Sequence, residues 1–351
     1  MLRNFVFFTL LITLSGITSF PQVATPPSQP ETGPGGKRIS NQTVIKNRYG
    51  TREKEYWIFE PATPKPTTAP VVIFLHGWGG TNPLYYGAWI DHLVKRGNIV
   101  IYPRYQANLL TSREDFLPNT VRAIKDAIQR LQTDNDHVRP DLNRVAIVGH
   151  SLGGLLAASV AAVAKENALP VMRAVMSVEP GLTRPPASVP LPDLNKIPST
   201  TLLLSIAGDR DTLVDDMDAK RIYYESTQVA ANNKNFIKLV SDEHGLPSLV
   251  ASHRAPTSPD RSYDNGEGDR TARSDINSQQ GIGSQLPAGS FMPEVNALDY
   301  FGTWKLFDGL SDAAFYGKNR EYALGNTPQQ RYMGKWSDGV AVKELIVLDK
   351  P

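Results

Sequence analysis

A regular alternation of short apolar runs and longer amphipathic runs limits the possible folds of this chain more than any other feature. The short runs are rich in Val, Ile and Leu, which is typical of strands that are buried on both faces. The longer runs have the spacing of apolar residues that indicates helices. Strands and helices that alternate in this way form a parallel sheet with helices packed on both faces. We therefore expect an α/β fold built on a doubly wound, mostly parallel sheet.

The same pattern gives the individual elements. The predicted strands are residues 55–61, 70–77, 98–103, 143–149, 172–180, 200–208 and 235–241. The predicted helices are residues 83–96, 117–134, 152–166, 214–230 and 295–317. Functional loops of a parallel sheet lie at the carboxyl ends of its strands. Residues that directly follow a predicted strand are therefore the first candidates for a site.

Composition and charge exclude several classes of protein. The chain has 351 residues, of which 40% are hydrophobic, and this is enough for one large globular domain. The net charge of +2 argues against a nucleic-acid partner, because proteins that bind nucleic acids usually carry a basic patch. The chain has no cysteine, so it has neither disulfides nor a lipid-modified cysteine. The sequence leaves the oligomeric state open.

The N-terminus has the order of regions found in a secretory signal. Arg3 precedes an apolar run at residues 5–14, and small polar residues follow that run. The run is short and contains several Thr residues, which makes it a poor membrane span. We expect residues 1–24 to be a cleaved signal peptide, so that the protein is secreted or periplasmic without stable insertion in a membrane. An uncleaved anchor is the alternative interpretation.

The remaining chain divides into a lead-in and one domain with a polar insertion. Residues 25–50 begin with a Pro- and Gly-rich stretch that holds too few large apolar residues to pack, so we expect a linker and lead-in. Residues 51–351 form the predicted α/β domain. Within this domain, residues 257–290 are rich in Gly, Ser and Asp and are expected to form a surface loop. The carboxylates of the loop could bind Ca²⁺, but their spacing does not match an EF-hand.

The hexapeptide GHSLGG at residues 149–154 lies between a predicted strand and a predicted helix. Gly149 and Gly153 lack a Cβ, so the strand and the helix can approach each other closely around a sharp turn. The turn holds the serine between them, Ser151, in a strained and exposed conformation. The N-terminus of the following helix points at this serine and favours negative charge there.

The G-x-S-x-G pattern between a strand and a helix resembles the nucleophile elbow of the α/β-hydrolase family. The resemblance implies that Ser151 is a nucleophile and that an acid and then a histidine base follow it in the chain. After the strand 200–208, the sequence GDRDTLVD is similar to the family segment that carries the acid, which maps the acid onto Asp211. Glu179, at the end of the preceding strand, and Asp209 remain alternatives.

The base is expected in the loop after the last predicted strand of the sheet. His244 follows this strand closely, in a loop that continues with glycine, and the family pattern is similar. The resemblance therefore maps the base onto His244. His253 is the other histidine that follows the acid, and it remains the alternative. His150 adjoins the serine and is expected to be structural.

The sequence HGWGG at residues 76–80 follows an early predicted strand and matches the H-G-x-G segment of the family. The resemblance implies an oxyanion hole made by the backbone N–H groups of Trp78 and Leu152. The segment between residues 180 and 200 is short and rich in proline, so it cannot form the helical cap that many lipases insert there. In this respect the chain resembles the lidless cutinase-, chlorophyllase- and polyester-hydrolase-like members.

Together these features predict a secreted serine hydrolase that cleaves carboxylic esters through a Ser-Asp-His triad and an acyl-enzyme. The expected partner is a small-molecule or polymeric ester, and the chemistry requires no cofactor and no metal. Three aromatic side chains near the oxyanion segment, those of Trp78, Tyr85 and Tyr105, are predicted to bind the substrate. An open aromatic cleft favours short to medium acyl esters or polyester segments over long triglycerides. A non-catalytic binding protein on the same fold and a serine peptidase or amidase are the alternative interpretations.

Overall fold

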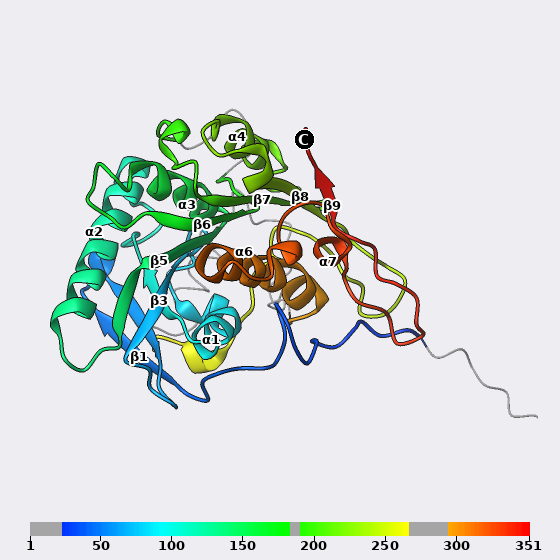
Figure 1. Ribbon diagram of the computed structural model, residues 1–351, viewed down its shortest axis with the longest axis horizontal. Coiled ribbons are helices and arrows are strands. Elements are labelled where there is room, and N and C mark those ends of the chain that lie inside the picture. The colour runs from blue at the N-terminus through cyan, green and yellow to red at the C-terminus, as the bar shows by residue number, and fades with distance from the viewer. Residues whose placement is uncertain (1–22, 183–189, 267–293) are drawn as a thin grey trace, which may run out of the picture.

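The computed structural model describes residues 23–182, 190–266 and 294–351. In this part of the chain, a nine-stranded sheet in the order β1-β2-β4-β3-β5-β6-β7-β8-β9 runs through the molecule, with helices on both sides (Figure 1). Adjacent strands from β4 to β8 in this order are parallel, whereas β1 and β2 at one edge and β9 at the other pair antiparallel. The predicted doubly wound, mostly parallel α/β sheet is confirmed.

The strands agree closely with the apolar runs of the sequence. The parallel strands are β3 (Thr68–Leu75), β4 (Ile99–Pro103), β5 (Arg139–His150), β6 (Met172–Val178), β7 (Leu202–Gly208) and β8 (Lys234–Leu239). The antiparallel edge strands are β1 (Val44–Tyr49), β2 (Tyr56–Pro61) and β9 (Ile346–Leu348). The sequence pattern did not predict β1 or β9, because β1 mixes polar and apolar residues and is only half-buried, while β9 is very short.

The helices lie in two layers, one on each face of the sheet (Figure 1). The α-helices are α1 (Gly87–Lys95), α2 (Arg113–Thr133), α3 (Leu152–Val163), α4 (Met217–Glu225), α6 (Trp304–Tyr316) and α7 (Pro328–Arg331), and a π-helical turn (Leu298–Thr303) precedes α6. Short 3₁₀ turns occur at η1 (Arg52–Lys54), η2 (Pro83–Tyr86), η3 (Leu194–Lys196), η4 (Ala231–Asn233), η5 (Arg261–Tyr263) and η7 (Arg320–Tyr322). Helices α1 and α6 share one hydrophobic core with the sheet, whereas α2 and α3 share the other.

Both faces of the central strands are buried, which explains their continuous apolar sequences. Successive side chains of a strand point to opposite faces of the sheet. In β3, Val72 and Phe74 belong to the core covered by α1 and α6, and Val71 and Ile73 belong to the core covered by α2 and α3. A strand with helices on only one side would instead alternate apolar and polar residues.

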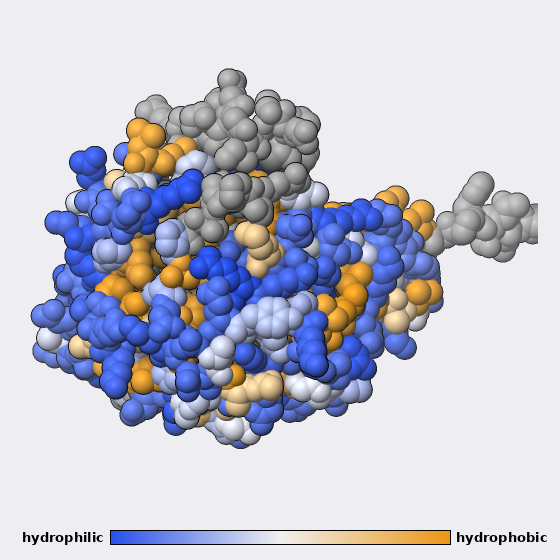
Figure 2. All heavy atoms as spheres, turned by 90° about the horizontal axis from the view of Figure 1, so that it is seen from above, coloured by the Kyte–Doolittle hydropathy of each residue, from blue (hydrophilic) through white to orange (hydrophobic). Residues whose placement is uncertain are grey.

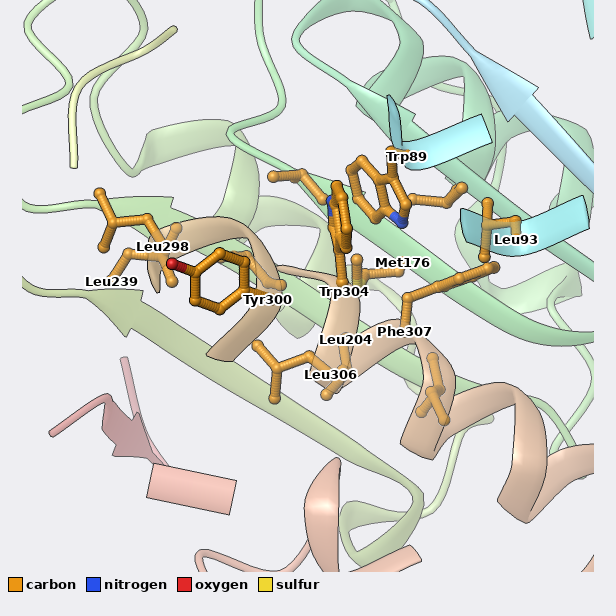
Figure 3. Packing of buried hydrophobic residues seen from close by; sticks show 14 of the residues in the cluster. Trp89, Leu93, Met176, Leu204, Leu239, Leu298, Tyr300, Trp304, Leu306 and Phe307 are labelled. Carbon is orange, nitrogen blue, oxygen red and sulfur yellow. The ribbon is translucent and has the colours of Figure 1, made fainter. Parts of the chain in front are cut away.

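The face covered by α1 and α6 contains a large aromatic core (Figure 3). Trp89 of α1 and Trp304 and Phe307 of α6 belong to the same buried cluster as Met176 of β6 and Leu204 of β7. The rings of Trp89 and Phe307 meet edge to face, with centroids 6.4 Å apart. These contacts fix α6 on the sheet, as expected from the apolar residues of the predicted helix 295–317.

The N-terminal segment packs against the body of the molecule, contrary to the prediction of a linker. The carbonyl of Ala24 accepts a hydrogen bond from the N–H of Leu246, and that of Pro27 accepts one from the hydroxyl of Tyr300. Further along, the N–H of Gly35 donates to the carboxylate of Asp308. The segment is held mainly through its main chain, which a count of apolar side chains does not reveal. The sheet itself begins with β1, inside the predicted lead-in.

Two sequence predictions fall wholly or partly outside the described residues. The predicted signal peptide lies almost entirely there, as does most of the predicted surface loop at 257–290. The described start of that loop packs on η2, because the N–H groups of Ser258 and Asp260 donate to the carbonyls of Tyr85 and Leu84. Among the described helices, each is too short or too polar to cross a bilayer.

Candidate active site

Ser151 lies at the turn between β5 and α3, at the carboxyl edge of the sheet. Its φ of 57° and ψ of −124° lie outside the regions that residues with a side chain normally adopt. The two neighbouring glycines permit this turn. A Cβ on Gly149 would lie 2.0 Å from the carbonyl oxygen of Gly153, and a Cβ on Gly153 would lie 2.2 Å from that of Leu75. The backbone strain at Ser151, about 1–3 kcal/mol in such cases, is therefore imposed by close packing of β3, β5 and α3.

The side chain of Ser151 forms one end of a hydrogen-bonded series. The distance from Ser151 Oγ to His253 Nε2 is 2.9 Å, and His253 Nδ1 lies 2.7 Å from Asp211 Oδ2. A carboxylate only accepts hydrogen bonds, so Nδ1 of His253 carries the proton and Nε2 is free to accept one from the serine. His253 is largely buried, with 13% of its side chain exposed. This arrangement can deprotonate a serine hydroxyl.

Asp211 is held in place from two directions. Its Oδ2 receives the hydrogen bond from His253, and its Oδ1 accepts from the N–H groups of Leu213 and Val214 at 2.9 and 3.1 Å. Burial favours the neutral acid, but the hydrogen bond and charge of His253 and the two backbone donors together hold the pKa of Asp211 below its ordinary value. Asp211 is therefore a fixed carboxylate that orients the imidazole.

The two alternative acids do not contact the histidine in this way. Asp209 hydrogen-bonds the N–H and hydroxyl of Ser241, in the loop after β8. Glu179 Oε2 lies 3.8 Å from His253 Nδ1, beyond hydrogen-bond distance. Both carboxyl oxygens of Glu179 are buried without a hydrogen-bond partner among the described residues. Burial, and then the charge of Asp211, raise the pKa of Glu179 well above its ordinary range, which favours the neutral form of the acid.

The prediction that His244 is the histidine partner of Ser151 is wrong. His244 Nε2 lies 2.7 Å from Asp338 Oδ2, its side chain is 36% exposed, and its ring packs on Trp336. Asp242 and Leu249 pair as an antiparallel bridge, so the intervening turn carries His244 toward the C-terminal segment. The chain returns to the strand ends only afterwards.

The return of the loop explains why the later histidine reaches the serine. The carbonyl of Ala251 accepts a hydrogen bond from the N–H of Arg210, which anchors the loop beside Asp211. His253 follows two residues later. A signal for this path was present in the sequence: Gly245 and Pro247 are turn residues, and the apolar Leu249 follows them. Distance along the chain from the end of β8 was the wrong criterion.

A comparison with known protein families found a match over the first part of the chain. The sequence model of the chlorophyllase family matches residues 35–205. The fold is that of the α/β-hydrolases. The match indicates an enzyme of the ester-hydrolysing kind, and it includes the loop at residues 76–80 and Ser151 but ends before Asp211 and His253. A search of curated proteins found no match.

The H-G-x-G loop at residues 76–80 passes directly beside the serine. A Cβ on Gly77 would lie 3.3 Å from the Cβ of Ser151. The loop is a tight turn, in which the N–H of Gly80 donates to the carbonyl of Gly77 at 2.9 Å and that of Gly79 donates to the side chain of Gln106 at 3.0 Å. Leu152 begins α3, so its N–H has no acceptor within the helix. The roles of the Trp78 and Leu152 N–H groups in an oxyanion hole remain predictions.

The three predicted substrate-binding aromatics have different environments. Tyr105 is completely buried, stacks on His76 with ring centroids 4.1 Å apart, and donates its hydroxyl hydrogen bond to the carbonyl of His76. The prediction that Tyr105 binds substrate is therefore wrong, because β4 directs it into the core between the sheet and α2. Trp78 and Tyr85 are half-buried, and their contact with substrate remains a prediction.

One group of residues has the composition of a metal site. Among the described residues, His150, Glu179 and His253 offer possible metal-ligand atoms that all lie within 4.8 Å of one another. Both histidines, however, are already engaged: Nε2 of His150 lies 2.8 Å from the carbonyl of His253, and Nδ1 of His253 binds Asp211. The donor set fits proton positioning better than metal binding.

Proposed function

We propose that this chain is a serine hydrolase that cleaves carboxylic esters through an acyl-enzyme. In this proposal Ser151 is the nucleophile, His253 is the general base and Asp211 orients and stabilises the imidazole. The observation that carries the proposal is the continuous series of hydrogen bonds from Ser151 Oγ through His253 to Asp211, at 2.9 and 2.7 Å. The family match to an esterase family over residues 35–205 supports the same activity.

The reaction follows from the proton positions at these atoms. Ser151 Oγ attacks the ester carbonyl carbon while its proton passes to His253 Nε2, and Asp211 stabilises the imidazolium that forms. The negative charge on the carbonyl oxygen is expected to be held by the N–H groups of Trp78 and Leu152 and by the N-terminus of α3. His253 then protonates the leaving alcohol, and a water activated by the same nitrogen releases the acid.

The substrate class that we propose is an ester with a short to medium acyl chain, or a polyester segment. Between β6 and β7, the described residues contain the short turn η3 and no α-helix that could act as a helical cap. The half-buried Trp78 lies in the loop beside Ser151, where an apolar acyl group would gain contacts. The apolar run at residues 5–14 supports export of the protein through a signal peptide.

Hydrolysis of p-nitrophenyl esters of increasing acyl length tests this proposal. We expect the butyrate ester to be cleaved faster than the palmitate ester, without a jump in rate above the micellar threshold. The Ser151→Ala variant controls for hydrolysis that does not involve this site, and it should lose about 10⁴- to 10⁶-fold in kcat. A chain that cleaves no ester would contradict the proposed activity. Preference for palmitate, or activation by micelles, would contradict the proposed substrate class alone.

A further inference from the structure

The buried side chain of His150 connects two loops of the proposed site, the loop of His253 and, through Tyr86, the loop of Gly77. It is the variable residue of the G-x-S-x-G turn, and it is 4% exposed. Its Nδ1 lies 2.8 Å from the hydroxyl of Tyr86, and its Nε2 lies 2.8 Å from the backbone carbonyl of His253. His150 therefore contacts the main chain of the proposed base, whereas the side chain of His253 makes the hydrogen bonds to Asp211 and Ser151 Oγ.

The chemistry of these partners determines where the protons lie. A carbonyl oxygen only accepts, so Nε2 of His150 carries a proton and donates it to His253. Burial, reinforced by the neighbouring His253, lowers the pKa of His150 to about 3, so the ring is neutral and its Nδ1 is an acceptor. The hydroxyl of Tyr86 must then donate to Nδ1.

The hydroxyl of Tyr86 also connects to the predicted oxyanion loop. Its oxygen accepts a hydrogen bond from the N–H of Gly77 at 3.0 Å. All donors in this network therefore point the same way: Gly77 donates to Tyr86, Tyr86 to His150, and His150 to the carbonyl of His253. Hydrogen bonds aligned in one direction polarise and strengthen one another.

We propose that His150 is a positioning residue that holds the main chain of His253 so that its imidazole reaches Ser151 Oγ, and that ties this position through Tyr86 to the loop of Gly77. This inference rests on the proposed function, because it assigns His253 as the base. His253 lies in an irregular loop rather than on a strand or helix, so it depends on such anchors. A displacement of about 1 Å at a catalytic group can cost about 10²-fold in rate.

The tautomer of His150 is measurable without reference to activity. In ¹⁵N spectra of histidine-labelled wild-type protein at pH 7, His150 should give the signals of a neutral ring protonated at Nε2. The signals are assigned by their loss in His150→Gln. A ring protonated at Nδ1, or a charged ring, would overturn the inference. In Tyr86→Phe the carbonyl of His253 still requires a proton on Nε2, so the same tautomer should remain, while the Nδ1 signal should move because this nitrogen has lost its donor.

The positioning role is then tested by measuring kcat and KM of each variant, with the concentration of active sites determined by titration. His150→Phe should lower kcat about 10- to 100-fold with little change in KM. His150→Gln should recover most of this loss, because its amide offers both an acceptor and a donor. The control is His137→Phe: His137 is also buried and is hydrogen-bonded to Glu60 and Tyr49, but it precedes the amino end of β5, whereas Ser151 follows the carboxyl end of that strand. This control should lower stability while kcat per site is unchanged.

A double-mutant cycle tests the coupling between the two loops. Tyr86→Phe and His150→Phe should each lower kcat, and the double variant should lose less than the product of the two losses, because both break the same network. Wild-type kcat in His150→Phe, or losses that simply multiply, would overturn the inference. A wild-type protein that hydrolyses no ester would instead contradict the proposed function, and the tautomer measurement would still decide the orientation of the network.

Discussion

His253 Nε2 lies 2.9 Å from Ser151 Oγ, whereas His244, in the same loop after β8, is hydrogen-bonded to Asp338. The bridge between Asp242 and Leu249 produces this difference, because it turns the chain away from the strand ends before returning it. The identity of the proposed base therefore depends on the path of one irregular loop.

Substitution of the two histidines should separate their roles. His253→Ala should reduce kcat/KM for p-nitrophenyl butyrate about 10⁴- to 10⁶-fold, because the other acceptor of the Ser151 hydroxyl, the carbonyl of Gly181 at 3.2 Å, cannot take up its proton. His244→Ala removes an exposed hydrogen bond with Asp338 and should change kcat/KM less than about twofold. The opposite ranking of the two variants would assign the base to His244.

Substitution of the two carboxylates near His253 should also give unequal effects. Asp211→Asn should lower kcat about 10⁴-fold, since the amide no longer fixes the tautomer of His253 or stabilises its charge. Glu179→Gln replaces a carboxyl group whose raised pKa favours the neutral form by an amide of similar shape, so kcat should fall only severalfold. Steady-state kinetics on the purified variants measure both. A severe loss in Glu179→Gln beside a mild one in Asp211→Asn would transfer the role of the acid to Glu179.

Glu179 should also make stability depend on pH in a defined direction. Its pKa is raised in the folded protein, so the native state keeps a proton that the unfolded chain releases as the pH rises. The free energy of unfolding therefore contains the full contribution of the protonated Glu179 at pH values below the pKa that this group has in the unfolded chain. Above that pKa the contribution decreases by at most about 1.4 kcal/mol per pH unit. Glu179→Gln does not ionise, so relative to the wild type it should be more stable at pH 8 than at pH 5. Urea unfolding of both proteins at the two pH values measures this, and a difference that is independent of pH would contradict it.

The glycine after the serine should be intolerant of a side chain. A Cβ at position 153 would lie 2.2 Å from the backbone oxygen of Leu75, and backbone cannot move aside cheaply. Gly153→Ala should therefore lower the free energy of unfolding by about 1–3 kcal/mol or more and displace Ser151. Gly302→Ala is the matched control, because its Cβ would meet flexible side-chain ends rather than backbone, Leu239 Cδ2 at 3.2 Å and Met333 Cε at 3.8 Å. Equal unfolding midpoints for the two variants would contradict the packing argument.

The sequence allowed most of the sheet to be predicted, because a strand buried on both faces must be apolar throughout. This held for β3, in which Val71 to Leu75 are fully buried. The edge strand β1 escaped detection, since one of its faces meets solvent. Ser151 could be singled out because its turn requires glycines at fixed local positions. These are all properties of residues close together in the chain.

The features that were not predicted depend on contacts between distant segments. Tyr105 was expected in the cleft because it follows β4, but the ring of His76 covers it. The choice of His253 over His244 depends on the pairing of Asp242 with Leu249, of which the sequence shows only the turn residues Gly245 and Pro247. The packing of the N-terminal segment rests on backbone hydrogen bonds to Leu246 and others, and side-chain composition carries no information about these.

Labelling with a fluorophosphonate, followed by mass spectrometry of the peptides, tests the central claim most directly, because only a serine activated by a base reacts. The wild-type protein and His244→Ala should both carry the adduct on Ser151 at similar rates. Ser151→Ala and His253→Ala should remain unlabelled under the same conditions, with folding verified by circular dichroism. An adduct on a different serine, or labelling of His253→Ala at the wild-type rate, would contradict the assignment of Ser151, His253 and Asp211 as the catalytic triad.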